Sequence, residues 1–460
     1  MRILLEILNA FYGGTLVGTF FRRAGGDVIE FEYEGSCLEP ISLSLPLSGE
    51  WAASAPGAFL DGLLPDGGND RLKMRFAIGA KSEDPFELLS NVDASGGLVF
   101  SRYPEIDTKA GLLEPVTRDD FMARAGDSLR PSSIWWEPGR RARFSLAGTQ
   151  AKFSIARRGG RWFWPNAEVP STHIVKPSRR SSPSVSEVEN ATLKLAGLCG
   201  LKTEGHALIE ADDFDAVVLE RFDRELLPDG GVRRLRAEDL CQALGRRSKA
   251  KYDVEIAELV SLLRKAGAGD ETLYGLIEQI AFNTYSGNAD GHAKNYTVLL
   301  DGGISLAPLY DAVVTWVWPA FDNSMAMGVN DVWFPWELDG DDWAREAEKC
   351  GLDDGKVREI AERMETGVLE NAPKAAETIS EEAARAAFVS AIEQANGIQS
   401  RKAADGAGDG RASEKKQAIR GGWDDVPRGT EAPTASPSSD KKSRISFSAV
   451  EWGGSRRPSH

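Results

Sequence analysis

Apolar and polar residues alternate along the first part of the chain and recur at helical spacing along much of the rest. Apolar residues alternate with glutamates over 29–34 and with serines over 41–45, which predicts two half-buried strands. Apolar residues at helical spacing predict a helix over 271–286 and packing helices over about 343–395. The stretch 403–460 is rich in Gly, Ser, Pro, Lys and Asp without apolar periodicity, and this composition predicts a disordered tail.

Between these parts, the pattern predicts a hairpin, a strand and a helix around one lysine. Two short apolar runs flank a Gly-Gly turn within 153–164, as in a β-hairpin. The next strand ends in Lys176, and we expect Pro177 to stop it. The capping pair Ser186 and Glu189 then begins a helix. Lys176 is either a solvated edge residue or an inward cation that meets the phosphates of a nucleotide.

Composition narrows the class of protein. The 460 residues and 42% hydrophobic content suffice for two or three structural units with real cores. A formal net charge of -15 argues against a surface that coats nucleic acid or an anionic membrane over its whole area. The 4 cysteines form no Cys-x-x-Cys pair, so we expect reduced thiols in a cytoplasmic protein. No run approaches the roughly 20 apolar residues of a membrane helix, so no membrane partner is expected.

Arginines and lysines cluster between residues 221 and 251 of this acidic chain. The cluster begins where a predicted strand, 216–221, runs into charged residues. That strand end is either a hinge that contacts adenine through backbone groups or a surface salt bridge. For the cluster, two interpretations stay open: a solvated basic face, or a docking surface for tRNA, DNA or an acidic partner.

The most polar stretch of the chain follows the helix predicted over 271–286. Asp290 is followed five positions later by Asn295, the spacing of a protein-kinase catalytic loop, in which the Asp takes the hydroxyl proton and the Asn holds a metal ion. A predicted hairpin then places Asp311 directly after a strand, an order that puts Asn295 and Asp311 on one divalent ion. We interpret His292 as a brace for the loop, because Asp290 suffices as the base.

A loop of small residues, 145–152, precedes the first hairpin and contains Lys152. Such a loop can cover phosphates with its backbone N–H groups. It matches neither Gly-x-Gly-x-x-Gly nor a Walker A motif, so an ordinary approach to a hairpin is the alternative.

Several motifs together resemble HipA-type serine/threonine kinase toxins, and with their flanks they cover about residues 1–395. In chain order they are Ser145-Leu-Ala-Gly-Thr-Gln-Ala-Lys152, Thr172-His-Ile-Val-Lys176-Pro177, Val218-Leu-Glu-Arg-Phe-Asp223, Glu238-Asp-Leu-Cys-Gln-Ala-Leu-Gly245, Asp290-Gly-His-Ala-Lys-Asn295 and Leu306-Ala-Pro-Leu-Tyr-Asp311. The resemblance implies an α+β, two-lobed protein-kinase-like fold with a strand-rich N-terminal subdomain and a mostly helical C-terminal lobe. The implied parts are the subdomain (1–105), a small lobe with phosphate loop and hinge (106–235), a large lobe with the catalytic loop (236–396) and the disordered tail (397–460).

The resemblance also implies ATP and Mg²⁺ as cofactors and a role for each motif residue. The implied residues are the base Asp290; the Mg²⁺ ligands Asn295 and Asp311; the ATP contacts Gln150, Lys152, Lys176, Glu220 and Phe222, the last two at the adenine hinge; and Ser145, whose autophosphorylation silences the kinase in the family. The implied partners are a small DNA-binding antitoxin, operator DNA only through the antitoxin complex, and a protein substrate. Known family substrates include aminoacyl-tRNA synthetases.

One departure affects the lysine strand. Family members often carry an Asn-Glu pair in the helix after it, whereas this chain reads Glu189-Asn190. One residue along a helix turns a side chain by about 100°, so we assign no carboxylate partner to Lys176. A small-molecule kinase, or a non-catalytic co-repressor that binds the antitoxin, remain as alternative functions.

Overall fold

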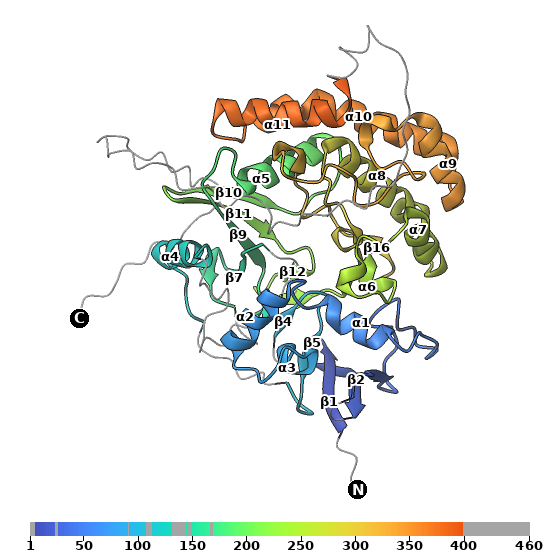
Figure 1. Ribbon diagram of the computed structural model, residues 1–460. Coiled ribbons are helices and arrows are strands. Elements are labelled where there is room, and N and C mark those ends of the chain that lie inside the picture. Colours follow the sequence, from blue (N-terminus) through green and yellow to red (C-terminus); the bar gives the residue numbers. More distant parts are fainter. Residues whose placement is uncertain are drawn as a thin grey trace, which may run out of the picture.

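The computed structural model describes residues 5–23, 26–90, 92–106, 113–130, 144–145, 150–165 and 169–398, without the side chains of residues 69, 144 and 145. The predicted tail therefore lies outside the described residues except for 397–398. In Figure 1 the N-terminal module (blue) lies below the green sheet of the small lobe, and the yellow and orange helices of the large lobe lie to the right of the sheet and above it. The mixed α+β, two-lobed arrangement confirms the predicted fold class.

The N-terminal module is an antiparallel sheet packed against short helices. Its strand order is β3-β2-β1-β5, with β1 (Leu5–Tyr12), β2 (Thr15–Arg23), β3 (Glu30–Tyr33) and β5 (Val99–Ser101). The helices are α1 (Ala55–Gly62), α2 (Gly68–Ile78) and α3 (Pro85–Leu88). The strand predicted over 41–45 is wrong. The carboxylate of Glu238 accepts hydrogen bonds of 2.6 Å from both Ser42 Oγ and Leu43 N, and these bonds hold the segment as turns against the large lobe.

The small lobe is a sheet of order β10-β11-β9-β7-β8. Its strands are β7 (Phe153–Arg158), β8 (Arg161–Phe163), β9 (His173–Arg179), β10 (His206–Glu210) and β11 (Phe214–Glu220), which confirms the predicted hairpin and strands. Pro177 does not stop β9 as predicted. The pairing of β9 with β7 ends at Val175, so Pro177 has a neighbouring strand on one side alone, β11, and edge-like positions tolerate proline. Helices α4 (Arg118–Ser128) and α5 (Val185–Leu198) flank the sheet.

The large lobe is mostly helical. Its helices are α6 (Leu240–Ala243), α7 (Ile256–Lys265), α8 (Asp270–Ser286), α9 (Gly340–Cys350), α10 (Asp354–Ala376) and α11 (Glu382–Ala395), with 3-10 turns η1 (Ser248–Ala250), η2 (Ala293–Asn295), η3 (Thr315–Val317) and η4 (Pro335–Glu337). A small sheet of β14 (Ala237–Asp239), β15 (Thr297–Leu299) and β16 (Ser305–Leu306) sits beside them, and β12 (Arg224–Leu226) pairs with β13 (Val232–Arg234). None of the helices in the described ranges has the length and hydropathy that a membrane crossing demands.

Two hydrophobic cores run through the described chain, and neither matches one sequence segment. The first joins the N-terminal sheet to one face of the small-lobe sheet, from Leu8 to Val218. The second joins the large-lobe helices to α5 and to Val217 and Leu219 on the other face of β11. Strand β11 therefore contributes side chains to both cores, because successive residues of a strand point to opposite faces.

The predicted basic cluster is partly an internal ion-pair network rather than a solvated face. Arg221 and Arg224, both buried, lie 2.8 Å from the carboxylate of Asp223, and Arg224 reaches Asp93 of β4 (Asp93–Ala94) at 2.9 Å. Arg234 approaches Asp93 at 3.2 Å. Burial raises the pKa of Asp93, but the three surrounding guanidinium groups outweigh it and lower that pKa. The network ties the N-terminal module to the start of the large lobe.

We expect Asp93→Asn to lower the free energy of unfolding by about 3–5 kcal/mol, because it leaves buried arginines without their counter-charge. Urea or thermal unfolding of the full chain measures the change. The matched control is Asp331→Asn, which breaks an ion pair with Lys349 whose acid is 89% exposed and should change stability by less than about 0.5 kcal/mol. Equal effects of the two substitutions would contradict a structural role for the network.

Candidate active site

The predicted catalytic loop begins where α8 ends. Gly287 closes the helix with φ 77, a left-handed conformation that suits glycine. Thr315, fully buried, then fixes the loop: its Oγ1 accepts a 2.9 Å hydrogen bond from Ala289 N and donates one of 3.2 Å to Gly287 O. The segment that follows Asp311 thus holds the loop that carries Asp290.

Asp290 lines a cavity between the lobes, with His292 beside it. The hydroxyl of Tyr252 donates a 2.6 Å hydrogen bond to Asp290 Oδ1, and the Tyr252 ring meets the His292 ring edge-on at 5.1 Å. Burial lowers the pKa of His292 to about 4, although Asp290 opposes the shift. The imidazole is therefore neutral at pH 7. The backbone N–H of His292 donates to Asn295 Oδ1 at 3.1 Å, a bond within the loop that does not involve the imidazole.

Asn295 and Asp311 meet, as their order in the sequence predicts. Asn295 Nδ2 donates to Asp311 Oδ2 at 3.2 Å. Asp311 has φ 51, a conformation uncommon for a residue other than glycine. Partial burial raises the pKa of Asp311, but the Lys176 and Lys152 ammonium groups outweigh it and hold the pKa below its ordinary value. Asp311 is therefore a carboxylate under all ordinary conditions.

Lys176 does have a carboxylate partner in the helix that follows it, which the sequence left unassigned. Its Nζ lies 2.6 Å from Glu189 Oε1 and 2.5 Å from Asp311 Oδ1. The predicted capping pair, Ser186 and Glu189, is wrong. Ser184 and Glu187 form the capping box of α5 instead, so the Glu189 carboxylate does not cap the helix. Burial lowers the pKa of Lys176, but the two carboxylates outweigh it and raise the pKa. Asn190 instead contacts His206.

The phosphate-loop residues reach the same cavity where the structure describes them. Lys152 is buried and lines it, and burial together with Lys176 lowers its pKa to about 8. Gln150 lines it too, and its buried Nε2 has no hydrogen-bond partner in the described residues. Ser145 lies in β6 (Phe144–Ser145), which pairs with β4 so that Ser145 is opposite Ala94, next to the cavity residue Ser95. The Ser145 side chain and residues 146–149 lie outside the described residues.

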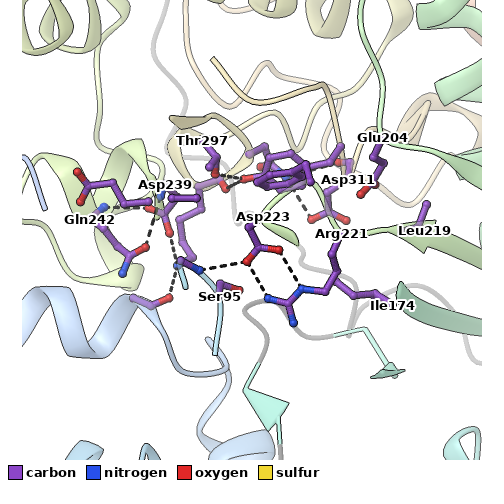
Figure 2. Close-up of a pocket in the computed structure, with 18 of the residues that line it drawn as sticks. Ser95, Ile174, Glu204, Leu219, Arg221, Asp223, Asp239, Gln242, Thr297 and Asp311 are labelled. Atoms are coloured by element: carbon purple, nitrogen blue, oxygen red, sulfur yellow. Dashed lines mark hydrogen bonds and ion pairs between the residues drawn. The ribbon is translucent and has the colours of Figure 1, made fainter. Parts of the chain in front are cut away.

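At the hinge, the two implied residues differ in position. Phe222 lines the cavity and packs on Tyr310 with ring centroids 5.0 Å apart. The Glu220 side chain is 62% exposed and lies 3.7 Å from His173, and Glu220 is not among the described residues that line the cavity. Ile174 and Leu219 form an apolar part of the cavity wall, and Asp223 and Arg221 line the cavity next to them (Figure 2).

The structure adds cavity residues that sequence reasoning missed. Asp66 comes from the N-terminal module, where no catalytic constellation was expected, and lies 3.0 Å from Lys251. Lys294 pairs with Asp239 at 3.1 Å and is therefore a structural cation of the loop. Glu204 is buried at the cavity wall (Figure 2). Burial outweighs Lys176 and raises its pKa well above the ordinary value. No local sequence signal marks these three, because each depends on contacts between distant segments.

The cavity residues fit a nucleotide and a magnesium ion. Lys152 and Lys176 offer cationic groups for phosphate oxygens, and Gln150 Nε2, which has no partner among the described residues, offers a donor. Asp311 and Asn295 provide the oxygen ligands that Mg²⁺ takes alongside phosphate and water. Among the described residues no three His, Cys, Asp or Glu side chains form a metal cage.

A two-lobed fold with a buried strand lysine paired to a helix glutamate, and an Asp-x-x-x-x-Asn loop facing a second aspartate, defines a protein-kinase-like phosphotransferase fold. A family model for the HipA-like C-terminal domain matches residues 144–372. The chain is 32% identical over 76% of its length to the Sinorhizobium fredii protein named "Putative kinase Y4mE", of which it covers 86%. It is 26% identical over 71% of its length to the serine/threonine-protein kinase toxin HipA of Shewanella oneidensis, of which it covers 79%.

A solved complex of Shewanella oneidensis HipA with HipB and operator DNA has the same fold. The TM-score is 0.72 at 23% identity, over 84% of this chain and 97% of that one. The chain belongs to the HipA-type serine/threonine kinase toxin family.

We expect Glu204→Gln to stabilise the protein at pH 8 but not at pH 4. The pKa of Glu204 is raised on folding. Glu204 therefore destabilises the folded state once the pH rises above the ordinary glutamate range, and it has no such effect below that range. The gain at pH 8 should be at least about 1.4 kcal/mol, the equivalent of one pKa unit. Thermal unfolding at both pH values measures it, and the exposed Glu370→Gln serves as the control. An equal effect of Glu204→Gln at pH 4 and pH 8 would refute the argument.

Proposed function

We propose that this protein is an ATP- and Mg²⁺-dependent serine/threonine protein kinase that acts as the toxin of a toxin–antitoxin pair and autophosphorylates Ser145. The observation that carries the proposal is the Lys176 ammonium held between Glu189 and Asp311, at 2.6 and 2.5 Å, in the cavity that also contains Asp290 and Asn295. That set supplies each part that phosphoryl transfer requires of a protein.

Each residue has a distinct task in this proposal. ATP supplies the phosphoryl group, and Mg²⁺ neutralises the charge that develops on it. Asp290 accepts the proton that the acceptor hydroxyl loses. Asn295 and Asp311 hold the ion, and Lys176 and Lys152 face the phosphate oxygens. The apolar wall of Ile174 and Leu219, with Phe222, accommodates the base, and the backbone at Glu220 provides its polar contacts.

Family membership supports the rest of the proposal. The Shewanella oneidensis relative is named as a kinase toxin, and the solved complex contains HipB and operator DNA. We infer that this chain likewise has a small DNA-binding antitoxin as partner, that it meets operator DNA only through that antitoxin, and that its substrate is a cellular protein such as an aminoacyl-tRNA synthetase.

We expect Asp290→Asn to lower the rate of phosphate transfer by about 10²–10⁴-fold, because the amide cannot take up the hydroxyl proton. Wild type, Asp290→Asn and Ser145→Ala are incubated with Mg-ATP and a cell extract, followed by intact mass and phosphopeptide mapping. Wild type should carry phosphate on Ser145 and on an extract protein, and Ser145→Ala on the extract protein alone. The exposed Asp270→Asn is the matched control and should behave as wild type. Phosphate found only on small molecules would indicate the small-molecule kinase instead, and no transfer by wild type would refute the proposal.

Lys152 predicts a pH dependence. With a pKa of about 8, its charge is present below that pH and is lost above it, so phosphate attraction weakens as pH rises. We expect kcat/KM for Mg-ATP, which reports the free enzyme, to fall about tenfold per pH unit above 8 if the charge is essential. Lys152→Arg keeps its charge throughout this range and should flatten that limb. An unchanged alkaline limb in Lys152→Arg would assign it to another group.

A further inference from the structure

The candidate base Asp290 already has one hydrogen-bond partner. The phenol of Tyr252 donates to Oδ1 at 2.6 Å, the short distance of a bond to a charged acceptor. Among the described residues no hydrogen bond reaches the second oxygen, Oδ2. One oxygen is thus fixed by the protein, and the other is open to the cavity that Asp290 lines.

Tyr252 is itself held against the catalytic loop. Its ring meets His292 edge-on at 5.1 Å, with Lys251 Nζ 5.2 Å from the ring centroid. The backbone of the preceding residue joins the same loop, because Lys251 O accepts a 3.1 Å hydrogen bond from Ala293 N. Side chain and backbone of this dipeptide therefore fix two points of the loop, on either side of Gly291.

The other side of this segment is anchored in the N-terminal module. Lys251 Nζ donates to Asp66 Oδ2 at 3.0 Å, and Ser248 N donates to Asp61 Oδ2 at 3.0 Å. Burial raises the pKa of Asp66, but Lys294 and Lys251 outweigh it and lower the pKa to about 2. Asp66 is therefore a permanent anion that keeps Lys251 in place. The segment 248–252 connects the module to the loop, and hydrogen bonds on both sides hold it in place.

We propose that Tyr252 is a positioning residue for phosphoryl transfer, an inference that rests on the proposed function. Its hydroxyl fixes the rotamer of Asp290 so that Oδ2 faces the acceptor hydroxyl and takes its proton. The alternative is an inhibitory role, in which the Tyr252 phenol occupies the place where the acceptor hydroxyl must bind. Removing the phenol hydroxyl would then raise activity. The anchoring on both sides favours positioning, because a phenol that blocks the acceptor has to move away in every turnover.

The test compares Tyr252→Phe with wild type in the full chain. Phenylalanine keeps the ring contact with His292 and loses only the hydrogen bond. We expect kcat for phosphate transfer to protein to fall between about tenfold and a hundredfold, the range of a misplaced catalytic group. KM for Mg-ATP should stay within about twofold. Tyr274→Phe is the matched control: it also has a lysine over its ring, Lys356, and a hydrogen-bonded hydroxyl, far from the cavity. It should leave kcat unchanged.

A second comparison tests whether Tyr252 acts through Asp290. In an Asp290→Asn background, adding Tyr252→Phe should change the residual rate by less than about twofold, because residues that act as a unit are not additive. If Tyr252→Phe equals or exceeds wild type in kcat while Asp290→Asn shows its expected loss, the positioning role is overturned and the kinase proposal stands. If wild type transfers no phosphate, both proposals fall. A rise in KM without a fall in kcat also overturns the positioning role.

Discussion

The ion pair of Lys176 with Glu189 and Asp311 is the interaction on which the arrangement of the site depends. It joins strand β9 and helix α5 of the small lobe to the segment after β16 in the large lobe, at 2.6 and 2.5 Å. The desolvation of a buried charge is costly, and one carboxylate rarely compensates for it. Two carboxylates from different elements do, and the second of them is in place only when the lobes are together. Asp311, the large-lobe partner, has the uncommon backbone angle φ 51.

The N-terminal module is part of this arrangement rather than an appendage. Gly96 donates its N–H to Asp223 at 3.2 Å and has φ 80. A Cβ there would lie 2.3 Å from Ala237 O, and one on Gly97 would lie 2.6 Å from Leu235 O, so only glycine lets the module approach the strand that leads to α6. The module also contributes Asp93 to the arginine network and Asp66 to the lining of the cavity. Docking of the module thus adds carboxylates to cations that are already partly paired within the rest of the chain.

Local patterns predicted much of the fold and the chemistry of the site, and failed where distant segments decide. The helix over 271–286, the hairpin within 153–164 and the proximity of Asn295 to Asp311 follow from periodicity and spacing, which are properties of short stretches. The strand over 41–45 failed because Glu238, far along the chain, replaces the sheet partner. No partner was assigned to Lys176 because the Glu189-Asn190 order departs from the family pair, and only the assembled strand and helix show that Glu189 reaches the lysine. The basic segment was misjudged because Asp93, which neutralises much of it, lies over a hundred residues away.

Contacts with three other parts of the chain fix the geometry of the catalytic loop. Thr315 fixes its start, the Lys251-Tyr252 pair fixes Asp290 and Ala293, and Lys294 fixes its end through Asp239 and the carbonyl oxygen of Gly62 at 3.1 Å. These restraints come from the segment after Asp311, from the turn before α7, and from the N-terminal module with β14. An Asp-x-x-x-x-Asn motif specifies which groups do the chemistry but not where they point. Their orientation is a property of the assembled chain, so Asp290 has this orientation only when the N-terminal module and the large lobe are docked together.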